Sequence, residues 1–249
     1  MIERSLFIRK ASIAWKHIDE GSYLFDIPAL RSIDSIEFHT PITLFAGENG
    51  MGKSTLLEAM AVAAGFNPEG GTRNYAFSTY DSHSELCGAI KIVKNAQHPK
   101  WGYFLRAESF YNVATKEDEY SKIGGVPEHF HEMSHGESFL QIADGQFKGN
   151  GLYFLDEPEA ALSPQRQLAL LRKICLCAKD GAQFFIVTHS PILLGMPYAE
   201  ILVFDDDGIH VSSYENTDSY QVTSLFMNRR EYMLEQLLGD GEECCHSTF

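Results

Sequence analysis

The stretch that decides the fold is residues 42–55, which read ITLFAGENGMGKST. It opens with an apolar run typical of a buried strand, passes through a glycine-rich loop and ends in residues that can start a helix. The loop fits the pattern G-x-x-x-x-G-K-S/T, in which glycines let backbone N–H groups surround a phosphate beside a helix amino terminus. Lys53 is expected to bridge the β- and γ-phosphates of a nucleotide, and Ser54 to bind Mg²⁺. The predicted nucleotide-binding residues are Gly47, Glu48, Asn49, Gly50, Met51, Gly52, Lys53, Ser54 and Thr55.

The rest of the chain alternates between strand and helix patterns, which predicts an α/β protein with a mostly parallel core sheet. Ser163 and Pro164 favour a helix start, and Gly65 favours a helix end. The predicted strands cover residues 6–14, 23–25, 33–38, 42–46, 88–93, 102–106, 152–155, 183–188, 201–204 and 209–213. The predicted helices cover residues 56–64, 164–178 and 229–238.

The composition, with 44% hydrophobic and 22% charged residues, is that of a soluble globular protein. The apolar runs are too short to cross a bilayer, and five cysteines without framework spacing indicate reduced thiols. We therefore expect a cytoplasmic location and no membrane insertion. The net charge of -14 opposes non-specific attraction to nucleic acid. Basic positions that could still bind a phosphate backbone, or simply form a solvated face, are Arg73, Lys91, Lys94, Lys100 and Arg106.

A second apolar run, residues 152–155, ends in the adjacent carboxylates Asp156 and Glu157. Alternation along a strand places neighbouring side chains on different faces, which suits two separate roles. Asp156 could hold Mg²⁺, and Glu157 could orient or deprotonate the attacking water. An acidic pair after a strand is otherwise a solvated helix cap, but its pairing with the phosphate loop favours the catalytic interpretation.

Two further segments could contact a nucleotide. His189 follows the apolar run 184–187, at the strand end where open α/β sheets bind ligands, and could sense the γ-phosphate. Residues 134–137 read SHGE, which fits a capping box at the start of a helix. A helix amino terminus with a serine and a glycine is also suited to binding the γ-phosphate of a second protomer.

These segments, in this order, resemble the ABC ATPases of the non-transport type found in chromosome maintenance and recombination. The stretches GENGMGKSTLLEA, RAESF, SHGESFL, LDEPEAALSPQRQ and THSPILL resemble those of small stand-alone bacterial ATPases described as AAA-family. The resemblance implies a P-loop NTPase fold with an N-terminal antiparallel β subdomain and a small helical signature subdomain. One domain would span residues 1–249, with parts at 1–46, 47–110, 111–150 and 151–249.

The resemblance also implies roles for individual residues. Lys53, Glu157 and His189 would be catalytic, with Glu157 as the base and His189 against the γ-phosphate. Ser54 and Asp156 would hold Mg²⁺, and Glu108 is the candidate for the glutamine-loop position near the metal. The signature residues, which would act on the nucleotide of the second protomer, are Ser134, His135, Gly136 and Glu137. They depart from the usual LSGGQ, and the interval after residue 108 is too short for a long coiled coil.

The function implied is hydrolysis of ATP in a Mg²⁺-dependent ATP-sandwich homodimer that controls an effector protein, as in phage-defence modules. The segment 159–163 resembles the loop that couples the two protomers. One alternative is an ATP-dependent clamp on DNA or RNA, and another is the ATPase subunit of a transporter. An aromatic side chain at Tyr23 or Phe25 is a candidate stacking platform for the base.

Overall fold

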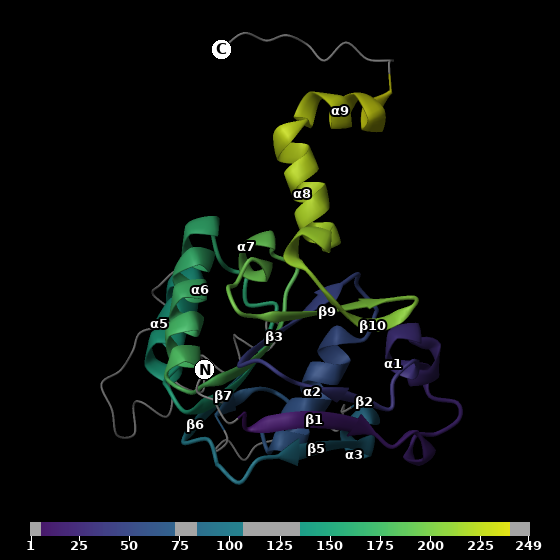
Figure 1. Ribbon diagram of the computed structural model, residues 1–249, viewed down its shortest axis with the longest axis vertical. Helices are drawn as coiled ribbons and strands as arrows, with labels where there is room; N and C mark the ends of the chain where they lie inside the picture. Colours follow the sequence, from purple (N-terminus) through teal and green to yellow (C-terminus); the bar gives the residue numbers. More distant parts are fainter. Residues whose placement is uncertain (1–5, 73–83, 107–134, 240–249) are drawn as a thin grey trace.

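The computed structural model describes residues 6–72, 84–106 and 135–239, and they form two sheets with helices packed around them (Figure 1). The larger sheet has seven strands in the order β10-β9-β3-β8-β7-β6-β4. Its five inner strands are parallel, and the edge strands β10 and β4 are antiparallel to their neighbours. The bounds are β3 Ile42–Gly47, β4 Gly71–Thr72, β6 Trp101–Arg106, β7 Gly151–Asp156, β8 Gln183–Val187, β9 Glu200–Asp205 and β10 Gly208–Ser212. The predicted α/β fold with a mostly parallel core sheet is confirmed.

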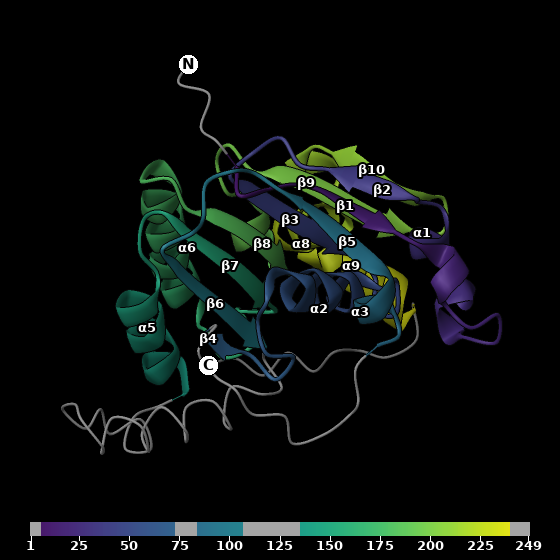
Figure 2. The same cartoon turned by 90° about the horizontal axis from the view of Figure 1, so that it is seen from below.

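The smaller sheet is antiparallel and has the order β2-β1-β5. Its strands are β1 (Ile8–Ile13), β2 (Ser35–Glu37) and β5 (Ile90–Lys94). The expected N-terminal β subdomain is therefore present, but its third strand comes from beyond the nucleotide loop. Figure 2 shows this sheet on the side of helix α2 (Lys53–Ala64).

The seven-stranded sheet lies between two apolar cores, so its central strands are buried on both faces. Phe154 and Phe185 stack on the face covered by α2, with ring centroids 5.3 Å apart. Tyr153 and Phe184 stack on the opposite face at 4.7 Å, where α5 (His135–Gln146) and α6 (Pro164–Lys179) pack. Adjacent residues on β7 and β8 thus serve different cores, as side-chain alternation along a strand requires.

Local sequence accounts for the ends of the main helices. Helix α2 stops at Gly65, whose φ of 97° is left-handed. Helix α6 begins after Ser163, whose side chain accepts a hydrogen bond from the backbone N–H of Arg166, and Pro164 occupies the first turn. The remaining helices are α1 Pro28–Arg31, α3 Leu86–Ala89, α7 Pro191–Leu194, α8 Asp218–Asn228 and α9 Arg230–Leu238.

The structure corrects the predicted secondary structure in several places; for example, residues 88–89, predicted to begin a strand, are the end of helix α3. Residues 23–25, predicted as a strand, lie in a 3₁₀ helix (Tyr23–Asp26) that turns Leu24 into the core. The ring centroids of Phe25 and Trp15 are 5.3 Å apart. The apolar side chains of this run therefore pack a turn against the core and do not belong to a strand. Helix α8 was not predicted; with α9 it extends away from the body at the carboxyl side of β3 (Figure 1). No helix of the described ranges is long and apolar enough to span a membrane.

Candidate functional site

The loop between β3 and α2 has the backbone that its glycines allow. Gly47, Gly50 and Gly52 have φ values of 128°, 85° and 83°, which side chains rarely permit. A Cβ at Gly47 would also overlap the carbonyl oxygen of Phe204. Glu48, Asn49 and Gly50 form an exposed tip, whereas Gly52 and Lys53 are buried. The loop is therefore a fixed cradle at the carboxyl end of a buried strand, the location suited to a phosphate.

Lys53 lies folded under this cradle. Its Nζ donates hydrogen bonds to the carbonyl oxygens of Gly47 at 2.7 Å and Glu48 at 2.6 Å. Burial lowers the pKa of Lys53, while the carboxylates of Glu157, Asp156 and Glu48 oppose that change. Because its two hydrogen-bond acceptors are neutral, a phosphate in the loop would give this buried ammonium a charged acceptor.

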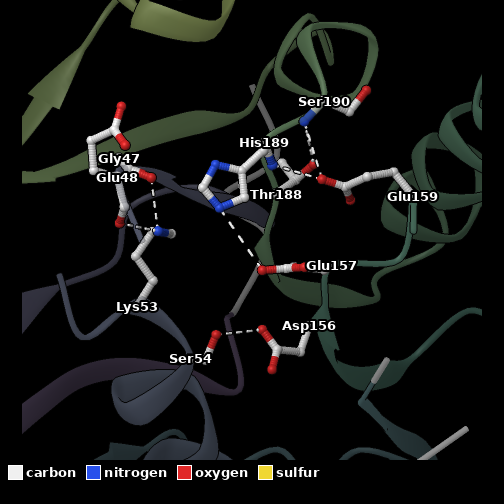
Figure 3. A network of polar contacts seen from close by, with 10 residues as sticks. All are labelled: Gly47, Glu48, Lys53, Ser54, Asp156, Glu157, Glu159, Thr188, His189 and Ser190. Atoms are coloured by element: carbon white, nitrogen blue, oxygen red, sulfur yellow. Dashed lines mark hydrogen bonds and ion pairs between the residues drawn. The ribbon is translucent and has the colours of Figure 1, made fainter. Parts of the chain in front are cut away.

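Ser54, the next residue of α2, faces the end of β7 across the site (Figure 3). Its Oγ donates a hydrogen bond to Asp156 Oδ1 at 2.8 Å. A hydroxyl and a carboxylate so close together on different elements are the oxygen donors that Mg²⁺ uses beside nucleotide phosphates. The two residues fit the role of metal ligands that the sequence predicted for them.

Glu157 and His189 form the other side of the site. Glu157 leaves the strand with a left-handed φ of 46°, and its backbone N–H donates to the carbonyl of Val187 at 3.0 Å. Its Oε1 lies 3.8 Å from Nε2 of His189, and the two side chains are 43% and 38% exposed. The adjacent carboxylates thus have different partners, Ser54 for Asp156 and His189 for Glu157. This arrangement suits one carboxylate near a metal and one near an attacking water.

A contact that the sequence did not predict joins Glu159 to the histidine segment (Figure 3). Glu159 Oε1 accepts hydrogen bonds from the backbone N–H groups of His189 at 2.6 Å and Ser190 at 3.1 Å. The two segments are 30 residues apart, and no local pattern signals that they meet.

The first turn of α8 was also missed, and it forms one wall of a cavity beside the loop. Thr217, Asp218 and Val222 line this cavity, of ≈ 260 Å³, opposite Gly47 and His189. The sequence of this segment contains no phosphate-binding pattern, so only the fold places it here.

The signature residues are described in part. His135, Gly136 and Glu137 form the first turn of α5, while Ser134 and Glu108 lie outside the described residues. Helix α5 packs on α6 and β6, on the face of the sheet opposite α2.

Among the candidate basic positions, Arg106 has a structural role, because its Nη1 lies 3.1 Å from Glu58 Oε2 and donates to the carbonyl of Pro68. Lys91, Lys94 and Lys100 are exposed, and Arg73 lies outside the described residues. The nucleic-acid clamp stays a prediction. Of the candidate base platforms, Tyr23 is 54% exposed and its hydroxyl donates to Ser84 Oγ.

Two family models match overlapping parts of the chain that together include the loop, the acidic pair and the histidine. A model of an AAA domain matches residues 24–131. A second AAA-domain model, described for the AbiEii toxin of a Type IV TA system, matches residues 109–195. These matches to AAA-domain models indicate an ATPase. The predicted ATP-hydrolysing activity is thereby confirmed.

The ATPase is also similar to solved structures. One is an ATP-binding cassette of an ABC transporter in its ADP conformation, with a TM-score of 0.45 and 16% identity, covering 94% of this chain and 99% of that one. Another is an inward-facing metal-chelate type ABC transporter, with a TM-score of 0.44 and 17% identity, covering 89% of this chain and 90% of that one. A search of curated proteins found no match to the ATPase.

Proposed function

We propose that this ATPase hydrolyses ATP with Mg²⁺ in a sandwich of two copies, and that closure of the sandwich controls an effector protein. The observation that carries the proposal is the position of α5. Helix α5, which begins with His135, Gly136 and Glu137, packs on the face of the sheet opposite α2. A second copy is then the natural source of signature contacts for each nucleotide.

The distance between α5 and the loop supports this arrangement. Helix α5 ends at Gln146, shortly before β7 begins at Gly151, so its amino end points toward the carboxyl edge of the sheet. It packs beside β6, which is three strand positions from β3. At about 4.8 Å per position the separation is about 14 Å, too far for hydrogen bonds to a phosphate in the same chain's loop. The amino end of α5 remains available to another protomer.

Each side chain of the site has a separate role in the proposed hydrolysis. Lys53 and the backbone N–H groups of the loop hold the β- and γ-phosphates. Ser54 and Asp156 would hold Mg²⁺, which when bound neutralises charge on the phosphate oxygens. Glu157 accepts a proton from the attacking water or orients it, and His189 contacts the γ-phosphate. Most of the rate enhancement comes from positioning and charge stabilisation.

Control of an effector is supported by the match to the model described for the AbiEii toxin of a Type IV TA system, which suggests a defence setting. It is also supported by α8 and α9, which extend from the body (Figure 1) and carry exposed apolar side chains. These include Val222, Met227, Leu237 and Leu238. An effector such as a nuclease could therefore respond to closure of the sandwich.

The Glu157→Gln variant tests the sandwich, because it removes the base while keeping the shape of the side chain. Hydrolysis should fall by about 10²- to 10⁴-fold, while ATP binding is retained. Sedimentation velocity with and without Mg-ATP should show a shift from monomer to dimer that the added change Ser134→Arg abolishes. The Glu20→Ala variant, at an exposed position, is the control. Measurable ATP binding with no change in mass would contradict the proposal.

A further inference from the structure

The loop that follows the acidic pair is hydrogen-bonded directly to the segment that holds His189. Glu159 lies in this loop and is partly buried, and its Oε1 accepts from the backbone N–H groups of both His189 and Ser190. The loop itself is ordered by hydrogen bonds from the N–H of Ala160 to the carbonyl of Glu157 and from the N–H of Leu162 to the carbonyl of Glu159. A single carboxylate thus joins two segments that approach the γ-phosphate side of the site.

A second connection runs parallel to the first. Gln167, in the first turns of α6, accepts a hydrogen bond from Ser190 Oγ at 2.6 Å and donates one to the carbonyl of Leu162 at 3.0 Å. Ser190 Oγ also accepts from the N–H groups of Ile192 and Leu193 at the start of α7. The loop 157–163 and the segment 188–190 are therefore tied at two points and should move as one unit.

The hydrogen bonds that Glu159 accepts are stronger than those between neutral groups. A carboxylate that accepts from backbone N–H groups makes charge-assisted hydrogen bonds, about twice as strong as neutral ones. The ring of His189, in contrast, is weakly held within the described residues: its buried Nε2 makes no hydrogen bond there and lies 3.8 Å from Glu157. The location of the histidine is thus fixed chiefly through its backbone, and Glu159 holds that backbone.

We infer that Glu159 is a positioning residue that holds His189 at the γ-phosphate and transmits any movement of the loop 157–163 to it. The inference rests on the role proposed above for His189. In the sandwich, a second copy that displaces this loop would shift the histidine of the same chain, because the carboxylate links them. Hydrolysis would then depend on the state of the interface.

The test compares Glu159→Ala, Glu159→Gln and His189→Ala by steady-state ATP hydrolysis and by nucleotide affinity. In Glu159→Ala, kcat should fall by about 10²-fold, the cost of a misplacement of about 1 Å, while KM for ATP changes less than about 2-fold. Glu159→Gln keeps an acceptor oxygen and should recover part of the loss. The thermal midpoint of each variant shows that it is folded, and Glu20→Ala serves as the matched exposed control.

The double variant Glu159→Ala/His189→Ala distinguishes positioning from a general structural role. If Glu159 acts through His189, removing it in the His189→Ala background costs no further activity. Additive losses, or a loss of nucleotide affinity equal to the loss of kcat, would overturn the inference. Full activity of Glu159→Ala beside an impaired His189→Ala would also overturn it. Full activity of His189→Ala would instead refute the role proposed for the histidine.

Discussion

Individual residues in the loop are constrained more tightly than the motif pattern states. Gly47 must be glycine for two separate reasons, its φ of 128° and the closeness of the Phe204 carbonyl. Gly50, at φ 85°, has open space where a Cβ would be. The two glycines therefore differ in what a methyl group would cost the folded chain.

This difference predicts unequal effects of alanine on stability. Gly50→Ala should cost about 1 kcal/mol of unfolding free energy from backbone strain alone. Gly47→Ala should cost at least about 2 kcal/mol more, because β3 or β9 must shift to relieve the overlap. Chemical denaturation without nucleotide measures both, and Gly50→Ala is the matched control. Equal costs would show that the contact with Phe204 is not limiting.

The lowered pKa of Lys53 predicts how ATP binding depends on pH. Burial disfavours the charged amine, so in the free protein Lys53 loses its proton below the ordinary lysine range around 10.5. A phosphate binds the charged form better, so ATP affinity should fall as pH rises through the pKa of the free protein. Titration of a fluorescent ATP analogue between pH 7 and about 10 measures the fall. Lys53→Arg, which stays charged, should show weaker but pH-independent binding; a parallel fall in both proteins would assign it to another group.

At the scale of elements, the position of α2 depends on an ion pair as well as on the phosphate loop. Glu58 of α2 and Arg106 at the end of β6 meet at 3.1 Å, with side chains 12% and 23% exposed. Arg106 also donates to the carbonyl of Pro68, which tethers the chain beyond α2. The ion pair therefore connects α2, which begins at the nucleotide loop, to the end of β6.

Removal of one partner of this pair is predicted to destabilise the fold. Arg106→Ala leaves the carboxylate of Glu58 mostly buried without that cation, and should lower the unfolding free energy by about 3 kcal/mol. Lys91→Ala, at an exposed position on β5, should change it by less than about 0.5 kcal/mol. Urea denaturation compares the two. A loss below about 1 kcal/mol in Arg106→Ala would show that water reaches the remaining carboxylate.

Elements with strong local patterns were predicted from the sequence, and elements set by the rest of the fold were not. The strands that end at Gly47 and Asp156 are mostly apolar and buried, and α6 carries its own cap at Ser163. The run at residues 23–25 was misread, because its apolar side chains pack a turn. Helix α8 includes β-branched and polar residues that are weak helix formers in isolation.

On the scale of the whole molecule, the site is assembled from segments that the sequence could identify but not arrange. Lys53, Asp156, Glu157 and His189 were each recognised from local patterns, and the strand order brings them together. The contact of Glu159 with His189 was not recognisable, because it depends on how the loop after β7 folds back. The cavity wall formed by the first turn of α8 likewise depends on the fold and not on a local pattern. Motifs thus predicted the candidate catalytic residues, and the fold showed which residues contact them.

The pairing of β3 has a consequence for the synthesis of the chain. This strand lies between β8 and β9, which end near residues 187 and 205, so neither neighbour exists when the nucleotide loop leaves the ribosome. A parallel strand cannot form its ladder before its partners are made, and such long-range pairing is slow. The nascent chain therefore carries an unpaired apolar strand at least until β8, which ends at Val187, has been translated. ATP can act as a ligand that stabilises the fold only after that point, and chaperones are the natural protectors of the segment before it.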